Sequence, residues 1–179
     1  FNTKGEGLPL YEGKMIHQYD AFYGEAQFWI APEKLAGLPA EFQAQLTEYR
    51  IAHRRIARST DARTLIAAIV PRNTACEVNA SVLLVTESVT GLEKLYLCAL
   101  LNSFVLDLVI RQKVSTTLNM FYLYSLPVPR LIAGNPFFDA IVPRAARLTC
   151  TRPEFAALWA SVMPGQPLPA GEDSESRQR

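Results

Sequence analysis

The sequence contains few of the side chains from which catalytic and metal sites are usually built. It has two histidines, His17 and His53, and three widely spaced cysteines that form neither a CxxC pair nor a Cys/His ligand pattern. We interpret Cys76, Cys98 and Cys150 as reduced thiols that pack as small hydrophobic residues, which favours a cytoplasmic protein. The GxGxxG, Walker, HExxH and GxSxG motifs do not occur either. The sequence therefore predicts no catalytic residue, no metal site and no cofactor site within this chain.

A strong charge imbalance and a long hydrophobic run are also missing. Lysine and arginine total 18 against 17 acidic residues, so the formal net charge is +1 and any electrostatic signal must lie in how charge is distributed. The longest apolar run, LYLCALLNSFVL from Leu95 to Leu106, falls short of the roughly 20 residues needed to cross a bilayer. The 179 residues, 49% of them hydrophobic, suffice for one domain with a buried core, and no membrane partner is expected.

The hydrophobic pattern predicts an α+β fold with a mixed, largely antiparallel sheet flanked by helices. Residues 64–70 (TLIAAIV) and 81–86 (SVLLVT) are typical of buried strands, and 120–131, with its two prolines, of a short strand or extended run. Helices are expected from 39 to 58, as one long apolar helix at about 92–113, and within 137–160. The expected domain limits are a flexible lead-in at 1–9, a folded domain at 10–163 and a disordered tail at 164–179.

The clearest local charge asymmetry lies between residues 49 and 72, where six arginines and a histidine stand against a single acid. On the expected helix, Arg50, Arg54 and Arg58 are spaced by fours and share one outward face. Such a face suits an anion, because the planar guanidinium group binds phosphate oxygens and guanine edges in pairs of hydrogen bonds. It is equally compatible with a solvated helix whose arginines pair with acids such as Glu41 and Glu48.

Two short segments add further polar side chains. The stretch after the long helix offers hydroxyl and amide donors that suit a DNA backbone but also suit a helix cap: Lys113, Ser115, Thr116, Thr117 and Asn119. The opening segment YEGKMIHQYD, residues 11–20, combines two tyrosines with Lys14, His17 and Gln18. It is typical of either a recognition loop or a hairpin with polar decoration.

Three segments, read together and in order, resemble a known family. They are PLYEGKMIHQYD (9–20), YRIAHRRIARSTDARTLIAAIVPR (49–72) and LLNSFVLDLVIRQKVSTTLNMFYLYSLPVPRL (100–131). They are similar to the C-terminal target-recognition, or specificity, region of adenine-specific DNA methyltransferases, including the fused restriction-modification enzymes of Type IIG. The family pattern for the second segment is R-x-x-A-R-x-T-x-x-R-T-x-I-x-x-x-x-P. The third segment is also similar to a helix and L-P-x-P run in Type I specificity subunits.

The resemblance implies a domain that grips duplex DNA and reads a short sequence, while a separate N-terminal methyltransferase domain binds S-adenosylmethionine and flips the target adenine. Phosphate contacts are then expected from Arg50, Arg54, Arg58, Arg63 and Lys113, with neutral donors from Ser115, Thr116, Thr117 and Asn119. Base-edge contacts are expected from Lys14, His17 and Gln18. Residues 22–41 and 72–80, which are less similar to the family, are the other candidates for reading bases. The implied location is the cytoplasm of a bacterial or archaeal cell.

Two further interpretations follow from the same residues. The chain could be a protein-interaction module whose arginine face and apolar helix pack on a partner subunit. Separately, Asn135-Pro136-Phe137-Phe138 resembles the Asn-Pro-Pro-Tyr/Phe loop of adenine methyltransferases, but a phenylalanine replaces the second proline. We interpret this segment as a turn that opens a helix.

Overall fold

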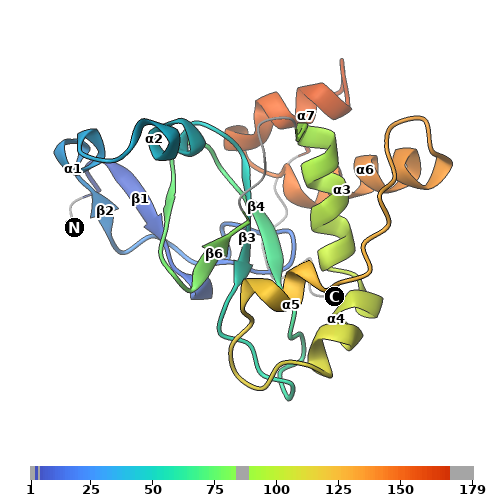
Figure 1. Cartoon of the computed structure of the whole chain (residues 1–179). Coiled ribbons are helices and arrows are strands. Elements are labelled where there is room, and N and C mark those ends of the chain that lie inside the picture. The colour runs from blue at the N-terminus through green and yellow to red at the C-terminus, as the bar shows by residue number, and fades with distance from the viewer. Residues whose placement is uncertain (1–2, 4, 84–88, 170–179) are drawn as a thin grey trace.

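Two small sheets and a layer of helices make up the computed structural model, which describes residues 3, 5–83 and 89–169. In Figure 1 the sheets lie on one side and helices α3, α6 and α7 on the other. The predicted α+β class and the largely antiparallel pairing are confirmed. The strands form two three-stranded sheets, however, where one sheet was expected.

The first sheet has the order β2-β1-β5, with β1 at Leu8–Tyr11, β2 at Trp29–Ile30 and β5 at Ala75–Cys76. Strand β1 runs antiparallel to β2 and parallel to β5. Because β1 begins at Leu8, the last two residues of the expected lead-in 1–9 belong to the folded domain. Two short helices, α1 at Pro32–Ala36 and α2 at Ala40–Leu46, follow β2.

The second sheet has the order β4-β3-β6 and is antiparallel throughout. Strand β3 (Arg50–Arg54) lies between β4 (Ala67–Val70) and β6 (Ala80–Val82). Both β4 and β6 fall within the stretches predicted as strands, at 64–70 and 81–86, except that β6 begins one residue earlier. Residues 84–86 of the second stretch lie outside the described residues.

The helix predicted for 39–58 is wrong. Helix α2 ends at Leu46, and Arg50–Arg54 form the central strand of the second sheet. The first four residues of that strand are all buried, because the sheet is covered on both faces. Burial of Ile51 and its neighbours therefore outweighs the three-to-five spacing that suggested a helix. The change of element also removes the predicted outward-facing row of Arg50, Arg54 and Arg58.

The long apolar helix predicted for about 92–113 is also wrong, because two helices replace it. Helix α3 spans Gly91–Leu101, and α4 spans Phe104–Arg111. Ser103 caps α4 by accepting a hydrogen bond from the Leu106 backbone N–H at 3.3 Å. The preceding residue, Asn102, turns its side chain onto strand β4, so the chain bends at this pair of residues.

Three further α-helices follow α4 within the described part of the chain. Helix α5 is Met120–Tyr124, where an extended run was predicted, α6 is Pro136–Thr149 and α7 is Ala156–Val162. Helix α3 packs against α6, α7 and β4. The side chain of Asn135 accepts from the Phe137 N–H and caps α6, which confirms that Asn135–Phe138 opens a helix.

The beginning of the expected tail is folded. The indole N–H of Trp159 donates to the Gln166 carbonyl at 2.9 Å, and Leu168 packs against the core. The remainder, 170–179, lies outside the described residues. Across the described ranges, no helix combines the length and apolar character needed to cross a membrane.

Candidate nucleic-acid interface

The three segments that carry the family resemblance meet around strand β4. The Tyr19 N–H, from the first segment, donates to the Ala67 carbonyl of the second at 3.0 Å. Asn102, from the third, brackets the same residue: its Oδ1 accepts from the Ala67 N–H at 3.1 Å and its Nδ2 donates to the Ala67 carbonyl at 2.8 Å. One amide side chain thus takes the place of a neighbouring strand at the edge of β4.

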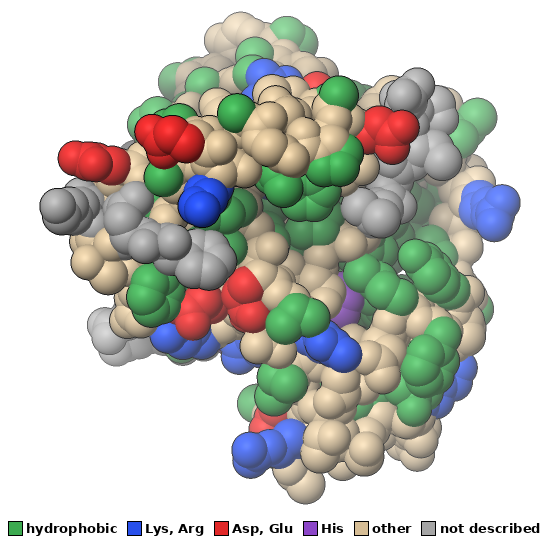
Figure 2. Space-filling model, turned by 60° about the vertical axis from the view of Figure 1, so that its left-hand side comes forward, with side chains coloured by type: hydrophobic (Ala, Val, Ile, Leu, Met, Phe, Trp, Pro, Cys, Tyr) green, Lys and Arg blue, Asp and Glu red, His purple; other side chains and the backbone are tan. Residues whose placement is uncertain are grey.

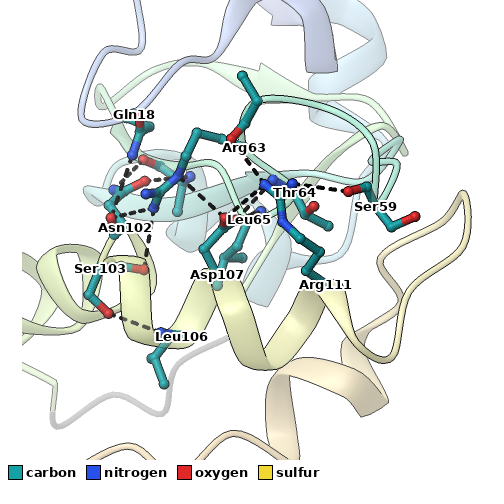
Figure 3. Close-up of polar contacts among 12 residues, drawn as sticks. Gln18, Ser59, Arg63, Thr64, Leu65, Asn102, Ser103, Leu106, Asp107 and Arg111 are labelled. Carbon is teal, nitrogen blue, oxygen red and sulfur yellow. Dashed lines mark hydrogen bonds and ion pairs between the residues drawn. The ribbon is translucent and has the colours of Figure 1, made fainter.

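A buried carboxylate fixes the loop that precedes β4. One oxygen of Asp107 accepts from the backbone N–H groups of Thr64 and Leu65, at 2.8 and 2.7 Å. The other oxygen lies 3.1 Å from Arg111 and 3.8 Å from Arg63. Figure 3 shows these side chains converging from α4 and the loop. Because the guanidinium of Arg111 also donates to the carbonyls of Ser59 and Ala62, the loop is tied to α4 along most of its length.

Three of the predicted phosphate ligands point into the protein. Arg50 is buried and donates to the carbonyl and hydroxyl oxygens of Thr74. Arg54 donates from Nε to the Gly13 carbonyl at 3.1 Å and from Nη2 to the carbonyl of Ile16. These two contacts join the opening segment to the second sheet. The predicted cationic row is therefore wrong, because the guanidinium groups of Arg50 and Arg54 donate to backbone carbonyls and only Arg58 remains exposed.

The guanidinium group of Arg63 is also occupied by contacts within the protein. Its Nη2 donates to the Asn102 carbonyl at 2.6 Å, and its guanidinium lies 4.6 Å from the centre of the Phe104 ring. On the face shown in Figure 2, lysine and arginine side chains are scattered among acidic and hydrophobic ones. A broad positive stripe is not seen on that face.

A cleft of about 730 Å³ opens between the first segment and the loop after β3. It brings together four predicted site residues, His17, Gln18, Arg54 and Arg63. The complete lining, from four parts of the chain, is His17, Gln18, Tyr19, Asp20, Tyr23, Arg54, Ile56, Asp61, Ala62, Arg63, Thr64, Ile66 and Leu148. Its size is in the range of small-molecule and nucleotide sites.

A second hollow of about 380 Å³ shares part of that lining and adds Lys14 and Arg58. Lys14 is exposed and lies 3.0 Å from the carboxylate of Glu12. Arg58 is exposed, and its guanidinium makes no hydrogen bond or ion pair with any residue from 5 to 83 or 89 to 169. It is therefore the predicted arginine best placed to meet an anion.

The hydroxyl segment after α4 lies beside this hollow. The Ala57 N–H donates to the Thr116 carbonyl at 3.1 Å, and Ile56 pairs with Thr117 in an isolated bridge. Ser115 and Thr116 are exposed there, whereas the side chain of Asn119 accepts from Arg55 at 3.4 Å. Lys113 is exposed and donates to Ser125, on the α5 side. None of this predicted group lines the hollow itself; Thr116 and Thr117 contact Ala57 and Ile56, and Ile56 is part of the lining.

A tight turn and an aromatic stack position His17 in the cleft. The backbone N–H and carbonyl of His17 pair with those of Asp20, and Tyr19 takes a left-handed conformation, with φ of 62°, within the turn. The His17 ring stacks on Tyr23 with 4.7 Å between ring centres. Burial lowers the pKa of His17, with a further lowering from the charge of Arg54 and an opposing effect from Asp20. The imidazole is therefore neutral at neutral pH.

Several residues that line the cleft were not predicted as site residues from the sequence. Among them are Asp20, Ile56 and Asp61, whereas Tyr23 was covered only by the broad candidate stretch 22–41. Asp61 is the one acid among the arginines of 49–72. The position of Asp61 as a single acid among arginines could have identified it, because such an acid usually pairs with one arginine or closes a turn. Here the Asp61 carboxylate accepts from the Arg58 N–H at 3.0 Å and closes the turn between them.

Cys76, Cys98 and Cys150 are unpaired, and burial raises the pKa of Cys98 and of Cys150 to about 12, so both are inert thiols at neutral pH. Over the described ranges, no three side chains of His, Cys, Asp or Glu lie close enough together to hold a metal ion.

Comparison with protein-family models, with curated proteins and with solved structures finds no match to this chain.

Proposed function

We propose that this chain is the target-recognition domain of an N6-adenine DNA methyltransferase, or of a restriction-modification enzyme that contains one. In this proposal it positions duplex DNA and reads a short sequence for a catalytic domain of the same parent protein. The present sequence contains no glycine-rich cofactor loop, so S-adenosylmethionine is expected to bind to that catalytic domain.

The observation that supports this proposal most is the convergence of the three family-like segments. They are far apart in the sequence, yet Tyr19, Ala67 and Asn102 are joined by hydrogen bonds. The cleft and the smaller hollow open where the first two segments meet, and the third is hydrogen-bonded to Arg55 and Ala57, on either side of Ile56 in the lining of both. A resemblance spread over three distant segments is easiest to explain if all three build one recognition surface.

The same geometry divides the family-like residues into two groups. Arg54 and Arg63 donate to backbone carbonyls and hold the recognition surface in shape. Lys14 and Arg58, in contrast, are exposed at the smaller hollow. We therefore expect phosphate contacts from Lys14 and Arg58, with neutral donors from Ser115, Thr116 and Thr117 beside them.

The first prediction concerns Arg58. Arg58→Ala should weaken binding to every duplex by a similar factor and lower the slope of log K against log salt by about 0.9, the value for one phosphate contact. The folded 179-residue chain would be titrated against a fluorescently labelled duplex at salt concentrations from about 50 to 200 mM. Fluorescence anisotropy reports the binding constant at each concentration.

Arg144→Ala is the matched control, because Arg144 is exposed on α6 and lines neither the cleft nor the hollow. This control should leave the slope unchanged. Absence of duplex binding by the folded wild-type chain, even at the lowest salt, would remove support for the proposed function. An unchanged slope in Arg58→Ala would show that Arg58 does not contact phosphate.

A second candidate function, a protein-interaction module, is favoured by the surface of α4. Phe104, Val105 and Leu108 are 83, 70 and 59% exposed, so the outer face of this eight-residue helix is apolar. Contiguous apolar surface of this kind often marks a protein contact. A partner bound there would be held by apolar contacts, and its affinity would change little over a salt range in which duplex binding falls steeply.

A further inference from the structure

The donors and acceptors that line the 730 Å³ cleft are unequally available to a ligand. The two guanidinium groups in its wall, Arg54 and Arg63, already donate to the carbonyls of Gly13, Ile16 and Asn102. They also face two carboxylates, Asp20 and Asp61, so the charged groups of the lining balance. An anion such as phosphate would gain little attraction here, and it would meet both carboxylates.

Each carboxylate in the cleft uses one oxygen for the fold and leaves the other available. One oxygen of Asp20 accepts from the Phe22 N–H at 2.8 Å, and one oxygen of Asp61 accepts from the Arg58 N–H at 3.0 Å. In the described part of the chain, the second oxygen of each makes no hydrogen bond. The unused capacity of the cleft is therefore mainly that of an acceptor.

The same cleft contains a flat aromatic wall. His17 and Tyr23 stack with an interplanar angle of 28°, and both rings line the cavity. Because His17 is neutral, this wall is uncharged and suits stacking with another flat ring. Gln18 lies beside it and offers an amide oxygen, since its amide nitrogen points toward the Asn102 carbonyl at 3.5 Å.

We infer that this cleft binds a nucleobase that carries an exocyclic amino group, with Asp20 and Asp61 accepting from the base and the His17–Tyr23 stack supporting its ring. Adenine, cytosine and guanine have such a group, and thymine and uracil do not. The inference rests on the proposed function, but it assigns the cleft to a base, whereas the phosphate contacts belong to Arg58 and the smaller hollow. The source of the base is a nucleotide turned out of its duplex or one in a single strand, because a base that remains stacked exposes only its edge.

The two histidines allow a direct test by NMR. His17 lines the cleft, whereas His53 is fully buried, so their ring Cε1–H signals provide a reporter and an internal control. The full chain would be titrated with adenosine, cytidine, thymidine and inorganic phosphate in turn. We expect adenosine or cytidine to shift the His17 signal saturably, thymidine to bind at least about fivefold more weakly, as for one lost hydrogen bond, and phosphate to have no effect.

Two isosteric variants make the test specific. Asp20→Asn and Asp61→Asn keep an oxygen for the backbone N–H but can turn the other acceptor into a donor, so each should weaken adenosine binding about fivefold. Glu33→Gln, an exposed change on α1, is the matched control. The inference is overturned if phosphate shifts His17 and nucleosides do not, if thymidine binds as well as adenosine, or if no nucleoside gives a saturable shift.

Duplex and single-stranded oligonucleotides of one sequence distinguish the two sources of the base. A His17 shift with the duplex indicates a base turned out of the helix, and a shift with the single strand alone indicates a base that is already unpaired. Nucleoside binding without duplex binding would overturn the proposed function and leave the base site standing. Duplex binding in which neither nucleosides nor duplex affect His17 would overturn the base site alone.

Discussion

Asp107→Ala is expected to lower the free energy of unfolding by about 3 to 5 kcal/mol, the cost of removing one partner from a buried ion pair. The change leaves the backbone N–H groups of Thr64 and Leu65 without their acceptor and Arg63 without its carboxylate. The side chains of Asp107 and Arg63 are 7 and 10% exposed, so water replaces little of what is lost. Urea unfolding followed by circular dichroism measures the loss.

Asp139→Ala is the control for this variant. Asp139 is an exposed carboxylate in the first turn of α6, and it accepts from the Gly134 N–H at 3.1 Å. Its removal should cost no more than about 1 kcal/mol. Equal losses in the two variants would show that the Asp107 cluster does not anchor the loop in front of β4.

Stability should fall by about 2 kcal/mol between pH 7 and pH 5 because of His53. His53 is fully buried in β3, and neither ring nitrogen makes a well-formed hydrogen bond among the described residues. Burial lowers the pKa of His53 from 6.5 to about 4, against a smaller opposing effect from the backbone of Arg54. The unfolded chain therefore binds more protons than the folded chain between these two values, so stability is lost as the pH falls through this window.

His53→Leu isolates this contribution. The variant should lose most of the pH dependence between pH 7 and pH 5, whatever its stability at pH 7, because leucine does not titrate. His17 also has a lowered pKa and contributes with the same sign, so the comparison is best made in a His17→Gln background. An unchanged pH dependence after loss of His53 would contradict the burial of a neutral imidazole in the core.

Local patterns located two of the buried strands correctly, whereas 120–131, predicted as a strand or extended run, contains helix α5. Residues 67–70 and 80–82 lie within or at the edge of the stretches predicted as strands, because short runs of buried apolar residues bounded by turns have few other solutions. The segment around Arg50–Arg54 was misread because both faces of β3 are covered, which removes the alternation that marks a strand. Pairing partners far along the chain decided its conformation.

The break between α3 and α4, within the predicted long helix, depends on a contact that the sequence does not reveal. Asn102 and Ser103 are acceptable as residues near a helix end, but only the position of Ala67 shows why the chain stops there. The same holds for Asp107, which reads as a charged residue on a helix and is in fact a buried acceptor. Side chains that bond to distant backbone groups have no periodic signature.

The sequence predicted several residues of the candidate site but not how they are arranged in space. His17, Gln18 and Arg58 were predicted from the sequence and do line the cleft or the hollow. Arg50 was predicted with them and lies buried against Thr74. Charge and spacing alone do not separate an arginine that holds carbonyls from one that meets solvent, since the difference lies in which backbone groups the fold leaves within reach.

The most direct measurement is amide chemical-shift mapping of the 15N-labelled chain with a short duplex at low salt. If the meeting point of the three segments is the DNA-contacting surface, the largest shifts will fall at residues 13–23, 55–63 and 115–117, and they will disappear as salt rises. Shifts confined to α4 or α6, or a spectrum that the duplex leaves unchanged, would contradict the claim that DNA binds where the three segments meet.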